Sequence, residues 1–386
     1  MRVSDVPCTA SLIHKRLAWR SNWLICMKQS SLESLFRTKH TFKNVKIVDL
    51  CCGAGGFTQG AVQAGHISFS AIDCDAAAIA CHAHNHPGCR HTHGSLPDVL
   101  PEFPKQGFWH LHASPPCQQV SSAGQYYKSE DALRTREMIS WCIELVRDKR
   151  PTSWSLEEVV SADVYAVLES YKQAFPDQVD FHRVNTAYYG LPQERTRVLA
   201  GSPFLIQRLR RLENRYKIVP VSSVITCPPG WLLHNNCLNV EGSKGPDANI
   251  TSVLTRSVNK PSYTIMASHP PSWYSQNGER GARLTPKETA AIQTFPKNYH
   301  FPENKTLAQH LIGNAVPPVL SEVLLSEYRP PLPPELDDWR PSLGKEFPDW
   351  EPSSQTYTRH ARESALNPPR KFTQTSLSFV SLEKQE

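Results

Sequence analysis

Short β-rich segments alternate with helical stretches between residues 44 and 202, and this alternation narrows the folds open to the chain more than any other feature. Apolar residues recur at helical spacing between several of the segments, for example in Glu130–Val146. Alternating strands and helices predict an α/β domain with a doubly wound, mostly parallel sheet, which binds its ligands at the carboxyl ends of the strands. The expected strands are Val45–Leu50, His66–Asp73, Phe108–Ala113, Thr152–Leu156, Val179–Val184 and Arg197–Ser202. Ser161 is expected to cap the helix that follows Thr152–Leu156.

The alternation stops after Ser202. Residues 203–282 are rich in Pro, Asn, Ser and aromatic residues, and they contain nine Lys or Arg against four Asp or Glu. This excess of five positive charges accounts for nearly all of the chain's formal charge of +6. We therefore expect a small, basic, separately folded insert, while the low total charge excludes a polycation that binds anions through charge alone.

The chain is expected to divide into five parts. Helical patterning returns at Thr285–Thr294 and Pro318–Tyr328, which indicates a return to the α/β domain. No apolar run approaches the roughly 18 residues of a membrane span, and the N-terminal stretch lacks the pattern of a secretory signal, so we expect neither membrane insertion nor secretion. The parts are an N-terminal extension (1–43), the α/β domain (44–202), the insert (203–282), the return (283–328) and a proline-rich tail (329–386) expected to be disordered.

A glycine-rich turn follows the first expected strand. The segment VDLCCGAGGF places Gly53, Gly55 and Gly56 between that strand and a helix, where missing side chains let a ligand approach the backbone. Asp73, about twenty residues further on, ends the next strand and could accept hydrogen bonds from ribose hydroxyls. A phosphate-cradling loop is disfavoured because no Lys follows the turn. A tight turn without any ligand remains open on these glycines alone.

A cysteine follows the third expected strand at the ligand-binding edge. In Ser114–Gln118, two prolines would fix the backbone and hold Cys117 on a rigid loop. The chain has eleven cysteines, an odd number without the spacing of a disulfide framework, which is typical of a reducing compartment. A reactive thiolate at Cys117 is therefore possible.

Six short motifs follow one another along the chain in the order of a known family. Together they resemble the motif series of the cytosine-5 DNA methyltransferases over about Val45–Leu325. The resemblance implies a class I, Rossmann-like methyltransferase domain, with residues 203–282 as its target-recognition domain. The motifs are DLCCGAGGFTQG, ASPPCQ, LEEV, YGLPQERTR, RLTPKETAAIQTFP and GNAVPPVL.

The resemblance also implies catalytic roles. Cys117 matches the nucleophile that adds to C6 of cytosine, and Glu157 matches the carboxyl group that acts at N3. Arg197 matches the arginine that holds the cytosine O2, and Arg195 lies two residues before it, on the same face of an extended strand. The target base would have to be flipped out of the duplex, because C6 cannot be reached inside it.

For the cofactor, the resemblance implies S-adenosylmethionine, converted to S-adenosylhomocysteine. Asp73 matches the acidic ligand of the ribose, and Asn314 matches a late motif that completes the same pocket. Val316 and the prolines after it are expected to pack against the first helix instead. The remaining expected cofactor ligands are Asp49, Gly53, Gly55, Gly56, Phe57 and Pro116.

Three residues depart from the family pattern. Cys51 stands where many members carry a Phe, and Ser95 where an acidic residue is common. Glu158 stands where an Asn is usual, so two carboxylates are adjacent in the sequence. We expect Glu158 to raise the pKa of Glu157 and favour its protonated form; displacement of the loop is the alternative.

A cluster of histidines and cysteines spans residues 81–93. Its spacing is not that of paired zinc ligands, and the family places a surface helix and loop there, so we expect solvated imidazoles and no metal.

Two other functions remain open on the sequence. One is an RNA cytosine methyltransferase, since one branch of the family acts on transfer RNA, and the other is a catalytically silent DNA-binding regulator. The expected partner is double-stranded DNA, bound by a monomer, with the tail as a possible site for a protein partner. The basic segment Gln207–Lys217 is expected to face the DNA, and a solvated helix is the alternative. The expected compartment is the nucleus in a eukaryote and the cytoplasm otherwise.

Overall fold

The computed structural model describes residues 44–115, 129–235, 255–276 and 279–326. The N-terminal extension and the proline-rich tail lie outside these residues, as do Pro116 and Cys117. Within the described part of the chain, no helix has the length and apolar character needed to cross a membrane.

A seven-stranded sheet forms the centre of the α/β domain. The strands β1 to β5 pair in parallel with one another. The strand β7 is antiparallel to both β5 and β6. The predicted doubly wound, mostly parallel sheet is confirmed. The strand order, from edge to edge, is β3 (Arg90–His93), β2 (Ile67–Asp73), β1 (Lys46–Leu50), β4 (Trp109–Ala113), β5 (Ser153–Glu158), β7 (Thr196–Gly201) and β6 (Asp180–Asn185).

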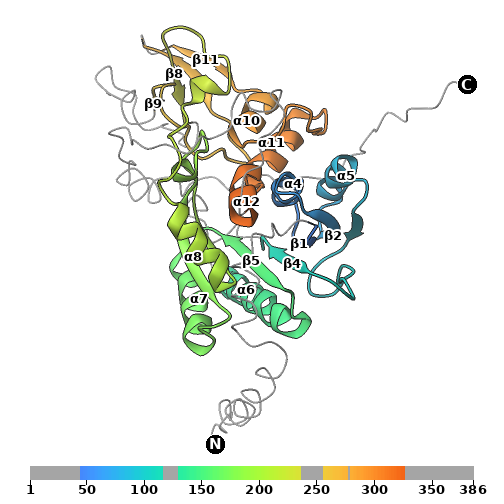
Figure 1. The fold of residues 1–386 in the computed structure, drawn as a ribbon. Helices are drawn as coiled ribbons and strands as arrows, with labels where there is room; N and C mark the ends of the chain where they lie inside the picture. Colours follow the sequence, from blue (N-terminus) through green and yellow to red (C-terminus); the bar gives the residue numbers. More distant parts are fainter. Residues whose placement is uncertain (1–43, 116–128, 236–254, 277–278, 327–386) are drawn as a thin grey trace, which may run out of the picture. The chain divides into compact units, whose positions relative to one another are not determined.

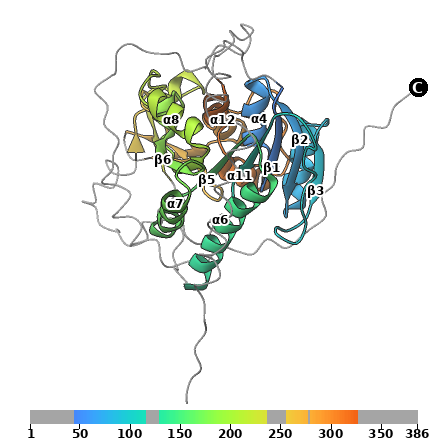
Figure 2. The same cartoon turned by 60° about the horizontal axis from the view of Figure 1, so that its bottom comes forward.

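Helices cover both faces of this sheet. Figures 1 and 2 show α6 (Ser129–Lys149) and α7 (Ala162–Ala174) on one side, and α4 (Gly56–Gln63) and α12 (Pro318–Leu325) on the other. The side chain of Ser161 caps α7 by accepting a hydrogen bond from the backbone N–H of Val164, as its position in the sequence predicted. Apolar residues of α6 and α7 pack against the strands in the main core, which includes Val48, Leu50, Leu111, Ile139, Ile143, Leu156, Val164 and Leu168.

The helix α8 (Pro203–Leu212) was assigned to the insert from the sequence. It contacts β6, β7 and α12, and its apolar residues Leu205, Ile206 and Leu209 are buried. The described contacts therefore attach α8 to the first sheet rather than to the segment that follows it.

A second, antiparallel sheet is built from short strands that the sequence did not indicate. Its order is β11 (Arg280–Arg283), β10 (Ser272–Ser275), β8 (Trp231–His234) and β9 (Thr255–Arg256). Residues of this sheet share a core with α10 (Pro286–Ile292) and α11 (Lys305–Asn314). The remaining elements are the helix α5 (Ala76–Asn85) and the 3-10 turns η1 (Thr186–Tyr189) and η2 (Val221–Ser223).

The C-terminal return packs tightly on α4. A Cβ added at Gly56 would lie 2.1 Å from the carbonyl oxygen of Val316, and one at Gly60 would lie 2.0 Å from that of Pro318. Side chains at either position would push α12 off the helix. The expectation that Val316 and the following prolines pack against the first helix is confirmed.

Candidate active site

The glycine turn and Asp73 meet at the carboxyl ends of β1 and β2. The backbone N–H of Gly53 donates to Asp73 Oδ2 at 2.8 Å, and that of Asp75 donates to Oδ1 at 2.9 Å. Gly53 has a φ of +53°, and a Cβ added there would have no described heavy atom within 4 Å. The turn is thus held open by Asp73, whose carboxylate oxygens keep lone pairs for a further donor.

Asp49 lies beneath the same turn and is 1% exposed. Its Oδ2 accepts a 2.7 Å hydrogen bond from the Thr58 hydroxyl, while its Oδ1 has no hydrogen-bond donor among the residues that the structure describes. Burial raises the pKa of Asp49 to about 7, against the lowering effect of the Thr58 hydrogen bond. An incompletely paired, buried carboxylate at this edge suits a cationic ligand such as the ammonium group of a methionine moiety.

The other glycines and Phe57 are explained by packing within the protein. A Cβ at Gly55 would meet the Tyr299 hydroxyl at 2.8 Å and His82 Cδ2 at 2.9 Å. The ring of Phe57 is 3% exposed and stacks on His112, with ring centroids 3.4 Å apart. Phe57 is therefore a core residue, and contact between its ring and a cofactor is not required to explain its presence.

Asn314 ends α11 and is exposed between buried neighbours. Its amide Nδ2 lies 3.1 Å from His310 Nε2. The amide is exposed in an otherwise buried segment, and its predicted place in the cofactor pocket stays a prediction.

The segment that leads into Cys117 lies at the point where the strand order reverses. The backbone N–H of Ser114 donates to the carbonyl of Leu50 at 3.1 Å, which joins the ends of β4 and β1. In open α/β sheets the ligand crevice forms at this reversal. Pro116 and Cys117 follow directly in the sequence but lie outside the described residues, so their assignment remains a prediction.

Glu157 on β5, the strand next to β4, forms an ion pair with Arg197 on β7, the strand that follows β5 in the sheet. Arg197 Nε lies 3.0 Å from Glu157 Oε1, and the two side chains are 14% and 9% exposed. Glu157 is directly opposite Leu199, so Arg197 lies diagonally across from it on the same face of the sheet. The structure thus brings together two of the four residues predicted to be catalytic.

Arg195 has a different set of contacts. It is 2% exposed, and its Nη1 donates to the backbone carbonyls of Gly313 at 3.0 Å and Ile265 at 3.4 Å. These carbonyls belong to the residue before Asn314 and to the core under the second sheet. The sequence predicted a catalytic Arg195 on the same face as Arg197, whereas these contacts indicate a positioning residue.

Glu158 points away from Glu157. Successive residues of β5 face opposite sides of the sheet, and Glu158 is directly opposite Val198. Its Oε2 accepts the Val159 N–H at 2.8 Å, and its charge adds to burial in raising the pKa of the Cys142 thiol of α6 to about 12. The expected coupling between the two adjacent carboxylates is not supported, because they occupy opposite faces.

A buried ladder of histidines and serines was missed from the sequence. Ser155 Oγ lies 2.9 Å from His110 Nε2 and 2.8 Å from His112 Nδ1, so a single hydroxyl joins the two rings. Each ring also bonds one further hydroxyl at 2.8 Å, Ser153 for His110 and Ser114 for His112. Alternating polar and apolar residues could have predicted this ladder. The segments HLH on β4 and SWS on β5 place their polar side chains on one face of adjacent strands.

The basic helix predicted to contact DNA is used largely within the protein. Arg210 pairs with the carboxylate of Asp180 at 2.6 and 2.8 Å, and Arg208 donates to the carbonyl of Leu324 at 3.0 Å. Burial alone would raise the pKa of Asp180, but the hydrogen bonds from Arg210 and Lys172 outweigh it and lower this pKa to about 2. Within Gln207–Lys217, the segment expected to face DNA, the exposed basic residues are Arg211, Arg215 and Lys217.

Two features define an α/β enzyme domain. The strand order reverses between β1 and β4, and polar groups lie at the carboxyl ends of the central strands, so the ligand site is at this reversal. A profile of the C-5 cytosine-specific DNA methylases matches residues 45–202 and 209–329. The match spans most of the chain, so this protein belongs to that family and is a DNA cytosine-5 methyltransferase.

Individual relatives agree with this assignment. The chain is 28% identical over 302 residues to the type II methyltransferase M.HindV of Haemophilus influenzae, covering 73% of this chain and 95% of that protein. It is 26% identical over 327 residues to M.NgoPII of Neisseria gonorrhoeae, covering 72% and 93%. A crystal structure described as a prophage-encoded DNA modification methyltransferase (E. coli) matches with a TM-score of 0.53 at 18% identity, covering 73% and 97%, and supports the fold alone.

Proposed function

We propose that this enzyme methylates C5 of a cytosine flipped out of duplex DNA, through a transient covalent bond between Cys117 and C6 of the base. The Glu157–Arg197 pair is the observation that carries this proposal. Glu157 lies on β5, the neighbour of β4, and Arg197 lies on β7 beyond it, while β4 leads directly into Ser114 and the loop of Cys117. An acid–base group and a fixed cation next to the nucleophile's loop are the components that activation of a cytosine ring requires.

Cys117 supplies the electrons that make C5 nucleophilic. Its thiolate adds to C6, and a carbon–sulfur bond forms as the ring electrons shift toward N3 and C5. Glu157 hydrogen-bonds N3 and stabilises that shift, while Arg197 neutralises charge at O2. After C5 has gained the methyl group, the C5 proton leaves to solvent, and the electron pair it leaves behind expels Cys117 as a thiolate.

The residues at the ends of β1 and β2 fit S-adenosylmethionine. When bound, this cofactor supplies an electrophilic methyl group on its sulfonium sulfur. Asp49 would accept the ammonium group through its incompletely paired Oδ1, and Asp73 would accept ribose hydroxyls. The open space at Gly53 and the exposed amide of Asn314 complete the set of groups proposed to bind the cofactor.

Recognition of the target sequence is proposed for the irregular part of the insert, about residues 226–278. Arg256 of this segment pairs with Glu194 at 3.0 Å, and the carbonyl of Ile265 accepts a hydrogen bond from Arg195. An exchange that keeps these two residues therefore preserves the support of β7 while the rest of the segment varies. Exposed Arg211 and Lys217 would add phosphate contacts that position the duplex without reading its sequence.

A labelled-methyl assay tests the substrate class and the nucleophile together. The full chain is incubated with radiolabelled S-adenosylmethionine and either duplex DNA or transfer RNA. We expect label in DNA cytosine and none in RNA, lost in Cys117→Ser and retained in the control Cys227→Ser. Labelling of RNA alone, or full activity of Cys117→Ser, would contradict the proposal.

Recognition is tested separately by a chimera. Residues 226–278, with Arg256 and Ile265 kept, are exchanged for the equivalent stretch of a relative, and the methylated product is read by bisulfite sequencing. We expect a changed target sequence with turnover preserved. An unchanged target sequence in an active chimera would place recognition elsewhere in the chain.

A further inference from the structure

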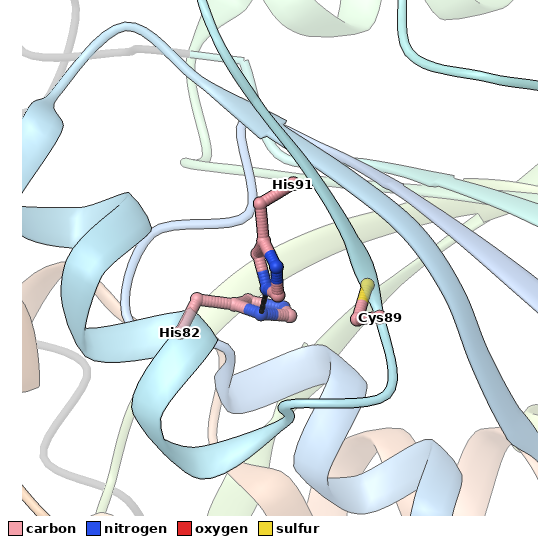
Figure 3. A group of neighbouring side chains, drawn as sticks. All are labelled: His82, Cys89 and His91. Carbon is pink, nitrogen blue, oxygen red and sulfur yellow. Dashed lines mark hydrogen bonds between the residues drawn. The ribbon is translucent and has the colours of Figure 1, made fainter.

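A buried cluster of potential metal ligands lies beside the glycine turn. His82 in α5, Cys89 in the loop after it and His91 in β3 have ligand atoms that all lie within 4.8 Å of one another. Figure 3 shows the rings of His82 and His91 turned toward each other, with Cys89 beside them. His82 is 0% exposed and Cys89 is 7% exposed, so the solvated imidazoles expected from the sequence do not describe this group.

The hydrogen bonds around His82 fix which of its nitrogens is free to bind a metal. The Thr58 hydroxyl donates its single proton to Asp49 Oδ2, so at 3.1 Å from His82 Nε2 its oxygen accepts. His82 Nε2 therefore carries the ring proton, and Nδ1 presents a lone pair to His91. This chain of carboxylate, hydroxyl and imidazole is the outer-shell arrangement that orients a metal-binding histidine.

The two histidines are joined where a metal would lie. His82 Nδ1 and His91 Nε2 are 2.8 Å apart, and a shared proton bridges them in the metal-free state. Tetrahedral zinc with bonds of about 2.0–2.3 Å needs donor atoms about 3.3–3.6 Å apart, so the rings must separate by roughly half an ångström.

We propose that His82, Cys89 and His91 form a zinc-binding site, with a solvent molecule as the fourth ligand. The thiolate and two imidazoles are ligands that zinc accepts in tetrahedral sites. His91 is only partly buried, which gives solvent access to the open position. On binding, the ring proton of His91 moves from Nε2 to Nδ1, so that the Nε2 lone pair can bind the ion, and the thiol proton of Cys89 is released to solvent.

The site would connect three parts of the cofactor edge. His82 belongs to α5, His91 to β3, and the Thr58–Asp49 link reaches α4 and β1. A Cβ at Gly55 would lie 2.9 Å from His82 Cδ2, so the imidazole packs directly under the glycine turn. A bound ion would therefore stiffen the turn without contacting the reacting atoms.

Metal analysis of the full chain, purified without a histidine tag, tests the site. Chelator-treated protein is dialysed against zinc and then against metal-free buffer, and zinc is measured by mass spectrometry. We expect one zinc per chain, lost in Cys89→Ser and in His91→Gln. The matched controls are Cys74→Ser and His93→Gln, and both should retain the metal. Cys74 is an exposed thiol, and the His93 ring hydrogen-bonds the carbonyl of Cys74 at 3.1 Å, outside the cluster.

Two further measurements exclude a loss of zinc through misfolding or binding elsewhere. Cobalt substitution should give a thiolate-to-cobalt charge-transfer band that disappears in Cys89→Ser and persists in Cys74→Ser. Thr58→Val, which keeps all three ligands but removes the orienting hydroxyl, should weaken zinc binding by about 10–100-fold. Absence of stoichiometric zinc in the wild type, or its retention in folded Cys89→Ser, would show a hydrogen-bonded histidine pair without a metal and overturn the proposal.

Discussion

Arg195 and Arg197 lie two residues apart but bind different parts of the molecule. Arg197 Nε lies 3.0 Å from Glu157 Oε1, at the edge where the nucleophile's loop begins. Arg195 Nη1 instead donates to the carbonyl of Gly313 at 3.0 Å, next in sequence to Asn314, which is proposed to bind the cofactor. One arginine therefore belongs to the reacting site, and the other holds the backbone that supports it.

Lysine substitutions separate these two roles, because lysine keeps the charge but loses the planar fork of donors. Arg197→Lys should lower kcat by about 100–1000-fold, the cost of losing a preorganised donor, with little change in Tm. Arg195→Lys should instead lower the free energy of unfolding by about 1–3 kcal/mol and raise KM for the cofactor. Steady-state kinetics and thermal unfolding measure both. A catalytic defect without a stability defect in Arg195→Lys would contradict the assignment.

The opposite orientations of Glu157 and Glu158 predict the effect of removing one charge. Glu158→Gln should leave the acidic limb of the kcat profile within about 0.3 pH units of the wild type, because the sheet separates the two carboxylates. The profile is measured between pH 5 and pH 9. A displacement of a full unit toward lower pH would mean that the carboxylates interact after all.

Cofactor affinity should depend on the ionisation of Asp49. Its pKa is raised to about 7, and the ionised form is the one that attracts an ammonium group. Affinity for S-adenosylmethionine should therefore fall about tenfold per pH unit below 7 and level off above it. Titration calorimetry at several pH values measures this, and Asp49→Asn should bind more weakly with a flat profile. An equally steep profile in Asp49→Asn would assign the effect to another group.

The histidine ladder predicts unequal costs for two similar serine substitutions. Ser155→Ala removes the hydroxyl that bonds both His110 and His112, so two buried ring nitrogens lose a partner. The expected loss is about 2–4 kcal/mol in the free energy of unfolding. Ser153→Ala removes one bond, at a partly buried position, and should cost about 1 kcal/mol. Denaturant unfolding compares them, and equal costs would argue against the shared hydroxyl.

The sequence predicted the central sheet well because each strand carries its own local signals. Val45–Leu50 is apolar and stops at glycines, and the observed strand is Lys46–Leu50. Ser161 was recognised as a cap because capping depends on residues only three positions away. The glycine turn and Asp73 were also found, since their spacing along the chain reflects a local strand–helix–strand unit.

Features that depend on contacts between distant residues could not be predicted from the sequence, because they leave no local pattern. The partners of Arg195 lie 70 and 118 residues further along the chain, so its burial had no local signal. The basic residues of α8 resembled a DNA-facing surface in the sequence. The carboxylate that binds Arg210 belongs to Asp180 on β6, 30 residues earlier, so this pairing had no local signal. The strands β8 to β11 are two to four residues long, too short to show a reliable period.

Trapping with 5-fluorocytosine tests the covalent mechanism most directly. Duplex DNA carrying the fluorinated base is incubated with the enzyme and S-adenosylmethionine, then denatured and separated by electrophoresis. Since fluorine cannot leave C5 as a proton does, the bond between Cys117 and C6 should persist, giving a denaturant-resistant complex that is absent in Cys117→Ser and present in Cys227→Ser. If the wild type methylates ordinary DNA but gives no such complex with the fluorinated substrate, the proposed mechanism is wrong.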